Sequence, residues 1–481
     1  ALIVLVIALN LVAISRITPA SMGSMGYFLN YTHGSFASFL AQYTILIGFI
    51  SSVPSEATAS VQYLSEWHYV FTQGLFDRNL GVLTNSGINV ASALCVVYFI
   101  INYFSLSLLA KSIKLVTIFK LFVPIISCIS LIAIGVSSNG VSNLYLVGDH
   151  TLSPYGFNGV LTAITTAGVI YAFNGFQTPI TFASEVENPK RNIPIAIIAS
   201  VLIAGTVYIA LQVAYLLAMP HDTLLHHGWR VLNFNSPFAS LAVALNMNLI
   251  ALLLYFDAVV SPSGAGIIYT SLSARVMCGM QPHMPNILTR IDKNTGLPRF
   301  ALILILLLSF VSLWFFPSWD KLAGVISVGY VICYSVTPVV NASFTYLKHK
   351  DNNLYTQSFK QKIINLIAPL GFILSTYMLY WSKWPLNGEI ILLVLSGLPI
   401  YFYYAMRNND MIFKEMLHAL WFILYLIFIA IFAYLGSSDF GGINFIKAGF
   451  DYIVLTIFAI LFFLFGVKSS YKTNLYHKEI K

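Results

Sequence analysis

The chain has 481 residues, of which 58% are hydrophobic, 15% aromatic and only 9% charged, with a mean hydropathy of +0.81. Soluble globular proteins carry about 25% charged residues, so this composition excludes a soluble globule. We therefore expect the net charge of +8 to reflect membrane topology rather than nucleic-acid binding.

Apolar segments of about 20 residues, the length of a membrane-spanning helix, recur along the chain. The first covers residues 1–15; it starts on Ala1 rather than Met and lacks the features of a signal peptide, so we expect sequence to be missing upstream. Further segments are expected at 36–56, 83–104, 113–137, 158–181, 193–218, 237–273, 299–317, 321–345, 363–382, 388–405, 415–434 and 446–467. The sequence thus predicts an all-α, polytopic membrane protein with about 13 transmembrane helices.

Lysine and arginine are unevenly divided among the predicted loops. With a cytoplasmic C-terminus, 19 of the 25 Lys and Arg residues fall in cytoplasmic loops, five in external loops, and Lys120 in a membrane segment. This division follows the positive-inside rule and predicts a cytoplasmic C-terminus. After the basic loop 348–362 the helices carry few polar groups. We therefore expect residues 1–345 to form the functional core and residues 346–481 to form accessory transmembrane helices.

One predicted membrane segment is interrupted by polar residues, glycine and proline. The stretch Tyr171–Pro179 reads YAFNGFQTP, and a polar loop over Glu185–Pro194 follows it. Backbone polar groups inside a bilayer must be satisfied, so an interrupted helix persists only where its free carbonyls and amides line a protein cavity or meet a ligand. The pattern predicts a ligand site at this break. A kinked helix packed against its neighbours is the alternative.

These motifs resemble those of the amino acid-polyamine-organocation (APC) permeases. The stretch Phe173-Asn-Gly-Phe-Gln177, with Glu185-x-x-Asn-Pro-Lys-Arg-x-x-Pro194, looks like the broken sixth helix and following loop of that family. Further similarity is seen in Pro262-Ser-Gly-Ala-Gly-x-x-Tyr269, Ala274-Arg275, Gly296-Leu-Pro-Arg299 and Ser318-Trp319. With Gly23-Ser-Met25 and Thr32-His-Gly34, the break is most similar to the bacterial aspartate-proton symporter branch. The likeness covers about residues 1–345.

The resemblance implies an inverted five-helix-repeat (LeuT-like) transporter fold, in which the broken helices of the two repeats face each other at the bilayer midplane. In this alignment Ala1 falls near the start of the family's second helix, and the first helix is absent from the chain. The residues expected to bind substrate are Phe173, Asn174, Gly175 and Gln177, with Phe173 and Phe176 as an aromatic lid. Gln177 stands where many members carry an acidic residue. It cannot titrate, so we expect no proton coupling at this position.

Two ionisable residues lie within predicted membrane helices. Lys120 costs about 2.5–3.5 kcal/mol to insert near the bilayer centre, and it matches a lysine on the fifth helix of some proton-coupled relatives. It is interpreted either as a proton-loading group or as a side chain that snorkels to the cytoplasmic face. Asp257 needs a partner or a proton, and Ser261 follows it one turn later. We expect these three residues to be candidates for proton coupling; a capping or bridging role for Asp257 is the alternative.

Two further residues are candidates for a vestibule or cavity. Glu56 lies near the predicted external end of its helix, where hydration at the interface is expected, with proton or substrate sensing as the alternative. Tyr330 lies one turn before Tyr334, and the pair is expected either to line the cavity or simply to pack.

The resemblance implies a secondary active amino acid transporter of a bacterial inner membrane, coupled to protons by symport, with an acidic amino acid as the favoured substrate. An amino acid exchanger of the same family, a transport-inactive truncated permease and a permease-like sensor are the alternatives. The chain has no Walker glycine loop, His-Glu-x-x-His or Gly-x-Ser-x-Gly motif, so we expect no enzyme activity. No cofactor, metal or nucleic-acid partner is expected. The expected partners are a small amino acid, the proton and the lipid bilayer, and the oligomeric state is left open.

Overall fold

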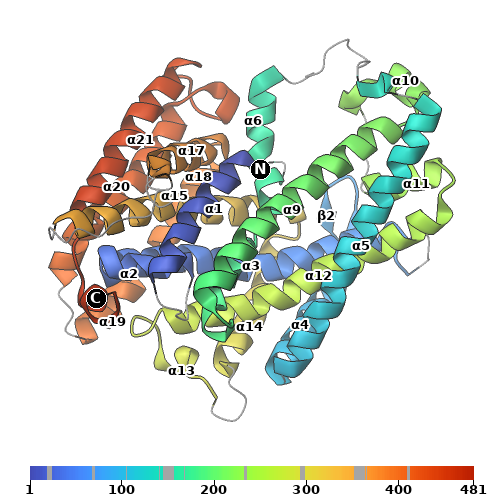
Figure 1. Ribbon diagram of the computed structural model, residues 1–481. Coiled ribbons are helices and arrows are strands. Elements are labelled where there is room, and N and C mark those ends of the chain that lie inside the picture. Colours follow the sequence, from blue (N-terminus) through green and yellow to red (C-terminus); the bar gives the residue numbers. More distant parts are fainter. Residues whose placement is uncertain are drawn as a thin grey trace.

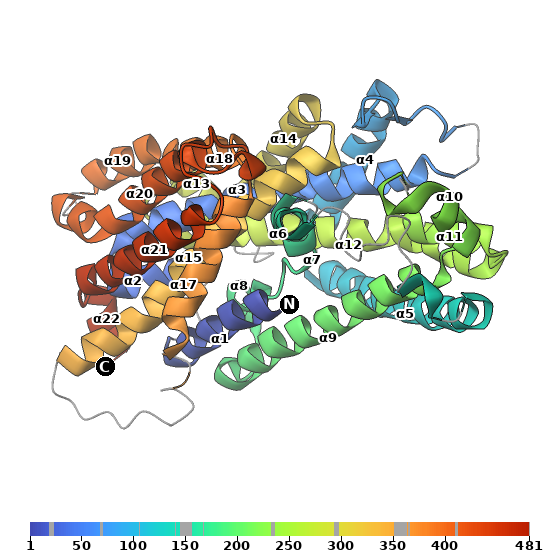
Figure 2. The ribbon, with the colours of Figure 1, turned by 90° about the horizontal axis from the view of Figure 1, so that it is seen from above.

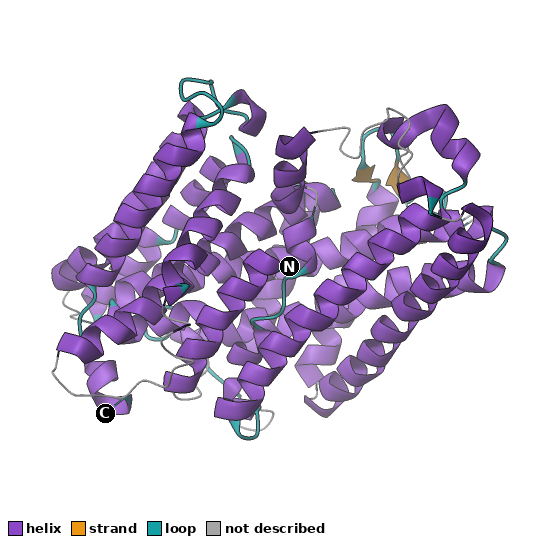
Figure 3. Cartoon of the chain, turned by 45° about the horizontal axis from the view of Figure 1, so that its top comes forward, coloured by secondary structure: helices purple, strands orange, loops and turns teal. Residues whose placement is uncertain are grey.

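The computed structural model describes residues 1–18, 24–67, 71–104, 106–139, 141–144, 156–166, 168–231, 236–292, 298–350, 363, 366–408 and 412–480. These residues are almost entirely helical (Figures 1 and 3). The one sheet among them is a short hairpin of β1 (Phe76–Asp77) and β2 (Val82–Leu83), with Phe76 opposite Leu83. Within these ranges nine helical segments are long and apolar enough to cross a membrane, and two shorter apolar helices accompany them. The predicted all-α, polytopic architecture is confirmed.

The first half of the described chain contains four helices of 20 residues or more, α3, α4, α5 and α9. Its elements are α1 (Leu2–Ile17), η1 (Met25–Phe28), α2 (Leu29–Thr32), α3 (Ser35–Leu64), α4 (Asn85–Phe104), α5 (Leu106–Asn139), η2 (Ser142–Leu144), α6 (Gly156–Thr166), α7 (Val169–Ala172), α8 (Thr178–Thr181), η3 (Ala183–Glu185) and α9 (Pro189–Ala218). The predicted segment 158–181 is therefore three short helices rather than one.

The second half is α10 (His221–Val231), α11 (Pro237–Ala244), α12 (Asn248–Gly279), α13 (Asn286–Thr289), α14 (Arg299–Phe315), α15 (Trp319–Lys350), α17 (Ala368–Trp381), α18 (Leu386–Leu395), α19 (Leu398–Arg407), α20 (Ile412–Leu435), η4 (Ser438–Phe440), α21 (Phe450–Ser469) and α22 (Asn474–Glu479). The segment predicted as one helix over 237–273 is divided into α11 and α12, because Asn246 between them has a left-handed φ of +58°. The expected domain boundary at 345 lies inside α15, and the division into core and accessory helices stays a prediction.

Two helices form the centre of the molecule. Among the membrane-spanning segments of the described chain, α15 and α3 are the most buried, and α3 packs along both α12 and α15. α1 lies beside α9, and α5 also packs against α9 (Figures 1 and 2). The C-terminal helices α19, α20 and α21 lie on the side of the molecule away from α4, α5 and α10 (Figure 1). The interrupted segment α6–α8 lies between α15 and α9, where it can contact both.

Candidate functional site

The predicted interruption is present in the structure and covers residues 173–177. α7 ends at Ala172, α8 begins at Thr178, and the five residues between them form turns. Gly168 and Gly175 adopt φ values of +79° and +113°, which glycine accepts without the cost of a side chain. Pro179 is in the first turn of α8, where its missing N–H is not needed. The sequence therefore ends one helix and starts the next within the apolar segment.

Two side-chain amides at the break are held by hydrogen bonds to their oxygen atoms. The Tyr334 hydroxyl, on α15, donates to Asn174 Oδ1 at 3.1 Å, and the Gly175 N–H donates to Gln177 Oε1 at 3.2 Å. These bonds fix the orientation of each amide, so the nitrogen atoms point elsewhere. Asn174 Nδ2 and Gln177 Nε2 are both buried without a hydrogen-bond partner within the described chain. A buried unpaired donor costs about 1–3 kcal/mol, which an acceptor on a bound ligand would recover.

The backbone of the break has open space at Gly175. A Cβ atom built there would meet no atom within 4 Å. Phe176 is buried, and its ring lies 5.4 Å from the ring of Tyr334. Phe173 packs instead on α9, with its ring 5.2 Å from that of Tyr208. The two phenylalanines contact different helices, so the structure does not support an aromatic lid made of both rings. Only Phe176 packs against Tyr334, the residue whose hydroxyl also donates to Asn174.

The carbonyl groups of the break are only partly free. The Tyr208 hydroxyl donates to Ala172 O at 2.5 Å, and Thr178 donates both its N–H and its Oγ1 to Gly175 O. Tyr330 is fully buried one turn before Tyr334, and the two rings are 6.2 Å apart. α9 and α15 thus hold the break from two sides.

Glu56 lies deep in the molecule, two turns before the end of α3. Its side chain is 8% exposed, and Glu56 Oε1 accepts a hydrogen bond of 2.6 Å from the hydroxyl of Tyr171, two residues before the break. The expected hydration of Glu56 at the interface is therefore wrong, because α3 runs on to Leu64 and Tyr171 covers the carboxylate. The ring of Tyr171 in turn packs at 5.7 Å on Trp319, at the start of α15.

Lys120 on α5 lies within electrostatic range of two carboxylates, Glu56 and Asp257. Its side chain is exposed, and in the described ranges it forms no ion pair. Asp257 on α12 is partly buried, its Oδ1 has no hydrogen-bond partner there, and Ser261 lies close enough to interact with it. The structure thus brings the three proton-coupling candidates together and adds Glu56 to them.

Comparisons with known proteins identify the family. The model of the amino acid permease family matches residues 1–406, well over half of the chain. The chain belongs to the amino acid permease family. The permease is 39% identical, over its whole length and 87% of the relative, to the glutamate/serine transporter AimA of Bacillus subtilis (strain 168). Over 95% of the permease and 85% of the relative, it is 32% identical to the aspartate-proton symporter of the same organism. The predicted resemblance is confirmed, and the function class is amino acid transport.

Two tyrosines of the permease were missed by the sequence reasoning. The Tyr171 hydroxyl donates a hydrogen bond to Glu56, and the Tyr208 hydroxyl donates one to the carbonyl oxygen of Ala172. An acid inside the membrane requires a partner, but several hydroxyl residues flank the break, so the sequence does not single out Tyr171. No sequence pattern places Tyr208, since its role depends on how α9 packs against α7. Within the described residues, no group of three His, Cys, Asp or Glu side chains is placed to hold a metal ion.

Proposed function

We propose that the permease is a proton-coupled symporter whose amino acid substrate binds at Phe173, Asn174, Gly175, Phe176 and Gln177. The observation that carries this proposal is the pair of unpaired, buried amide groups, Asn174 Nδ2 and Gln177 Nε2. A substrate carboxylate presents about four lone-pair positions and can accept from both. Gly175, where a Cβ atom would meet no atom within 4 Å, leaves space in the same turn.

The substrate that we propose is an acidic amino acid. Asn174 and Gln177 are neutral donors, so no fixed negative charge at the break opposes a second carboxylate. Hydrogen bonds from amides to a carboxylate are charge-assisted and stronger than neutral ones. The names of the two relatives, a glutamate/serine transporter and an aspartate-proton symporter, support the same class.

Proton coupling is proposed to use Lys120, Asp257 and Ser261 together with Glu56. Glu56 accepts a hydrogen bond from Tyr171, which lies in α7, the short helix that ends directly before the break. When Glu56 binds a proton, its carboxyl group becomes a weaker acceptor, and the bond that holds Tyr171 loosens. Lys120 lies within range of both carboxylates, so its charge balances theirs. Protonation of this cluster therefore changes the hydrogen bonding of the segment that binds the substrate.

We further propose that the permease lies in a bacterial inner membrane with its C-terminus in the cytoplasm. The excess of Lys and Arg in alternate loops supports this orientation. The two relatives from Bacillus support placement in a bacterial membrane.

The test is uptake of labelled L-aspartate and L-glutamate into proteoliposomes with an imposed pH gradient. We expect uphill uptake that a protonophore abolishes, and we expect Asn174→Leu and Gln177→Leu each to weaken substrate binding by about tenfold or more. The matched control is Asn192→Leu, because Asn192 Nδ2 donates to Glu187 O at 2.6 Å on the exposed start of α9, away from the break. Counterflow without a pH gradient, undiminished by the protonophore, would indicate an exchanger instead. Binding without any flux would indicate a sensor or an inactive permease.

A further inference from the structure

An ion pair joins the segment after the break to α12. Arg275 Nε donates to Glu185 Oε1 at 2.9 Å, and Arg275 Nη2 lies 2.8 Å from the same oxygen. The guanidinium carbon lies 4.5 Å from the ring centre of Phe182, and Nη1 donates to Ser271 Oγ one turn earlier on α12. These contacts fix the guanidinium on α12. Glu185, at the end of η3, brings the chain that follows α8 to this fixed group.

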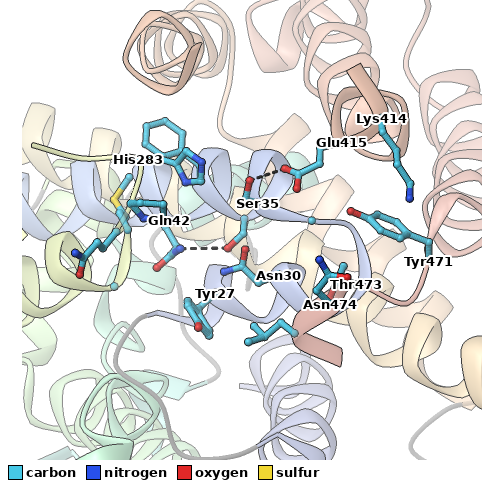
Figure 4. A pocket seen from close by; sticks show the side chains of 18 of the residues that line it. Tyr27, Asn30, Ser35, Gln42, His283, Lys414, Glu415, Tyr471, Thr473 and Asn474 are labelled. Carbon is cyan, nitrogen blue, oxygen red and sulfur yellow. Dashed lines mark hydrogen bonds between the residues drawn. The ribbon is translucent and has the colours of Figure 1, made fainter. Parts of the chain in front are cut away.

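The ion pair lies on the side of the molecule that holds the C-terminal segment. Arg275 is four residues before the end of α12 at Gly279. His283, just beyond that end, lines the same cavity as Thr473 of the C-terminal segment (Figure 4). The end of α12 and the C-terminal segment are therefore neighbours, and the ion pair holds the chain after the break at this side.

A different kind of contact holds the other end of the interrupted segment. The rings of Phe344 and Tyr476 stack at 6.1 Å, which places the end of α15 beside the C-terminal segment. Trp319, at the start of this 32-residue helix, therefore lies on the opposite side. There its ring packs edge-on against Tyr171 of α7 at 5.7 Å. The segment from α7 to η3 is thus held by aromatic packing toward one side and by an ion pair toward the other.

The exposure of the two charged side chains suits a contact that opens and closes. The Glu185 side chain is 46% exposed, so water can solvate its carboxylate when the pair separates, whereas the Arg275 side chain is only 10% exposed. A fully buried pair resists separation strongly, and a fully exposed pair contributes almost nothing. Residues 186–188 form bends rather than a helix, so few backbone hydrogen bonds oppose movement of Glu185 relative to α9.

We propose that the Glu185–Arg275 ion pair is a latch that holds the segment after α8 on α12, and that its separation opens the break toward the side of the C-terminal segment. α12 packs along the buried helix α3 and provides the fixed part of the contact. Glu185 is joined to Gln177 through α8 and η3, so its release frees the half of the interrupted segment that carries this amide. The inference rests on the proposed function only in taking this opening as the exit of the substrate to the cytoplasm.

The test measures the accessibility of Thr181→Cys, a substitution that nearly keeps the size of the side chain. Thr181 is the last residue of α8 and is 2% exposed. A membrane-impermeant maleimide is added to membrane vesicles of each orientation, and mass spectrometry separates this site from the four native cysteines. With Glu185→Ala or Arg275→Gln we expect labelling from the C-terminal face to become about fivefold faster, and labelling from the other face to stay the same. Both changes remove one contact, so the double variant should label no faster than the faster single variant.

The matched control is Arg78→Gln, which removes another ion pair of the described chain. Arg78 Nη2 lies 3.0 Å from Glu66 Oε2, beyond the end of α3, and this pair does not involve the interrupted segment. Labelling from the C-terminal face should be unchanged in this variant. An unchanged rate in both Glu185→Ala and Arg275→Gln would overturn the latch, and so would equal acceleration from both faces or the same acceleration in Arg78→Gln. Labelling needs neither substrate nor a pH gradient, so its failure is distinct from failure of the proposed symport.

Discussion

Substitution of Gly175 by alanine tests whether the backbone of the break determines substrate affinity. Gly175 has a φ of +113°, which residues with a side chain rarely adopt, yet a Cβ there would meet no atom within 4 Å. The methyl group fits, so its cost comes from the backbone alone, about 1–3 kcal/mol for a residue held in such a conformation. The unliganded variant relieves this strain by a change of φ, whereas the bound state needs φ near +113°, so substrate affinity falls by roughly 5- to 150-fold.

A second glycine provides the matched control. Gly449, before α21, has a φ of +93° and also has open space where a Cβ would lie. Gly449→Ala carries the same kind of strain far from the break. Binding of labelled L-aspartate and the melting temperature are measured on both purified variants. We expect Gly449→Ala to lower the melting temperature without loss of affinity, and Gly175→Ala to lose affinity. Unchanged affinity in Gly175→Ala, or an equal loss in Gly449→Ala, refutes the reasoning.

Three other changes test separate parts of the structure. Lys120→Ala should abolish pH-driven accumulation in proteoliposomes and leave substrate binding measurable; retained uphill uptake removes Lys120 from the coupling. Tyr171→Phe deletes the 2.6 Å bond to Glu56 and should destabilise the permease by about 1.5–3 kcal/mol, read as a lower melting temperature; an unchanged value contradicts the contact. Burial lowers the pKa of His33, which lies outside the membrane-spanning segments, to about 4, so the unfolded chain binds its proton first. The contribution of His33 is complete above about pH 6.5 and falls by up to about 3 kcal/mol toward pH 4. His33→Gln should lose less stability over that range, and parallel melting curves would exclude this cause.

The helices and the break could be predicted because each depends on local sequence. Long apolar runs require a membrane, and Gly175 with Pro179 interrupts one of them within a few residues. The division between α11 and α12 could not be predicted, because Asn246 gives no strong signal inside an apolar run. Asparagine adopts a left-handed φ more readily than most residues, but an asparagine alone does not show that a helix is divided there.

The position of Glu56 shows the same limit. Its distance from the predicted helix end suggested hydration, but α3 extends to Leu64 and crosses the centre of the molecule. Whether an acid on a membrane helix faces water or a partner depends on the helix tilt and on the neighbouring helices. The partner, Tyr171, is 115 residues away in the chain. Pairing over that separation is set by tertiary packing rather than by any local motif.

The break is held by hydrogen bonds from two central helices, and this arrangement gives the proposed coupling a physical basis. Tyr171, two residues before the break, is bonded to Glu56 on α3, while Asn174 within the break is bonded to Tyr334 on α15. α3 and α15 are the most buried helices of the described chain and pack on each other, so they act as a fixed frame. A proton at Glu56 alters the first bond, and a substrate at the amides alters the second. Because few residues separate the two bonds, each ligand changes the free energy of the conformation that the other one binds, which is the condition for coupled transport.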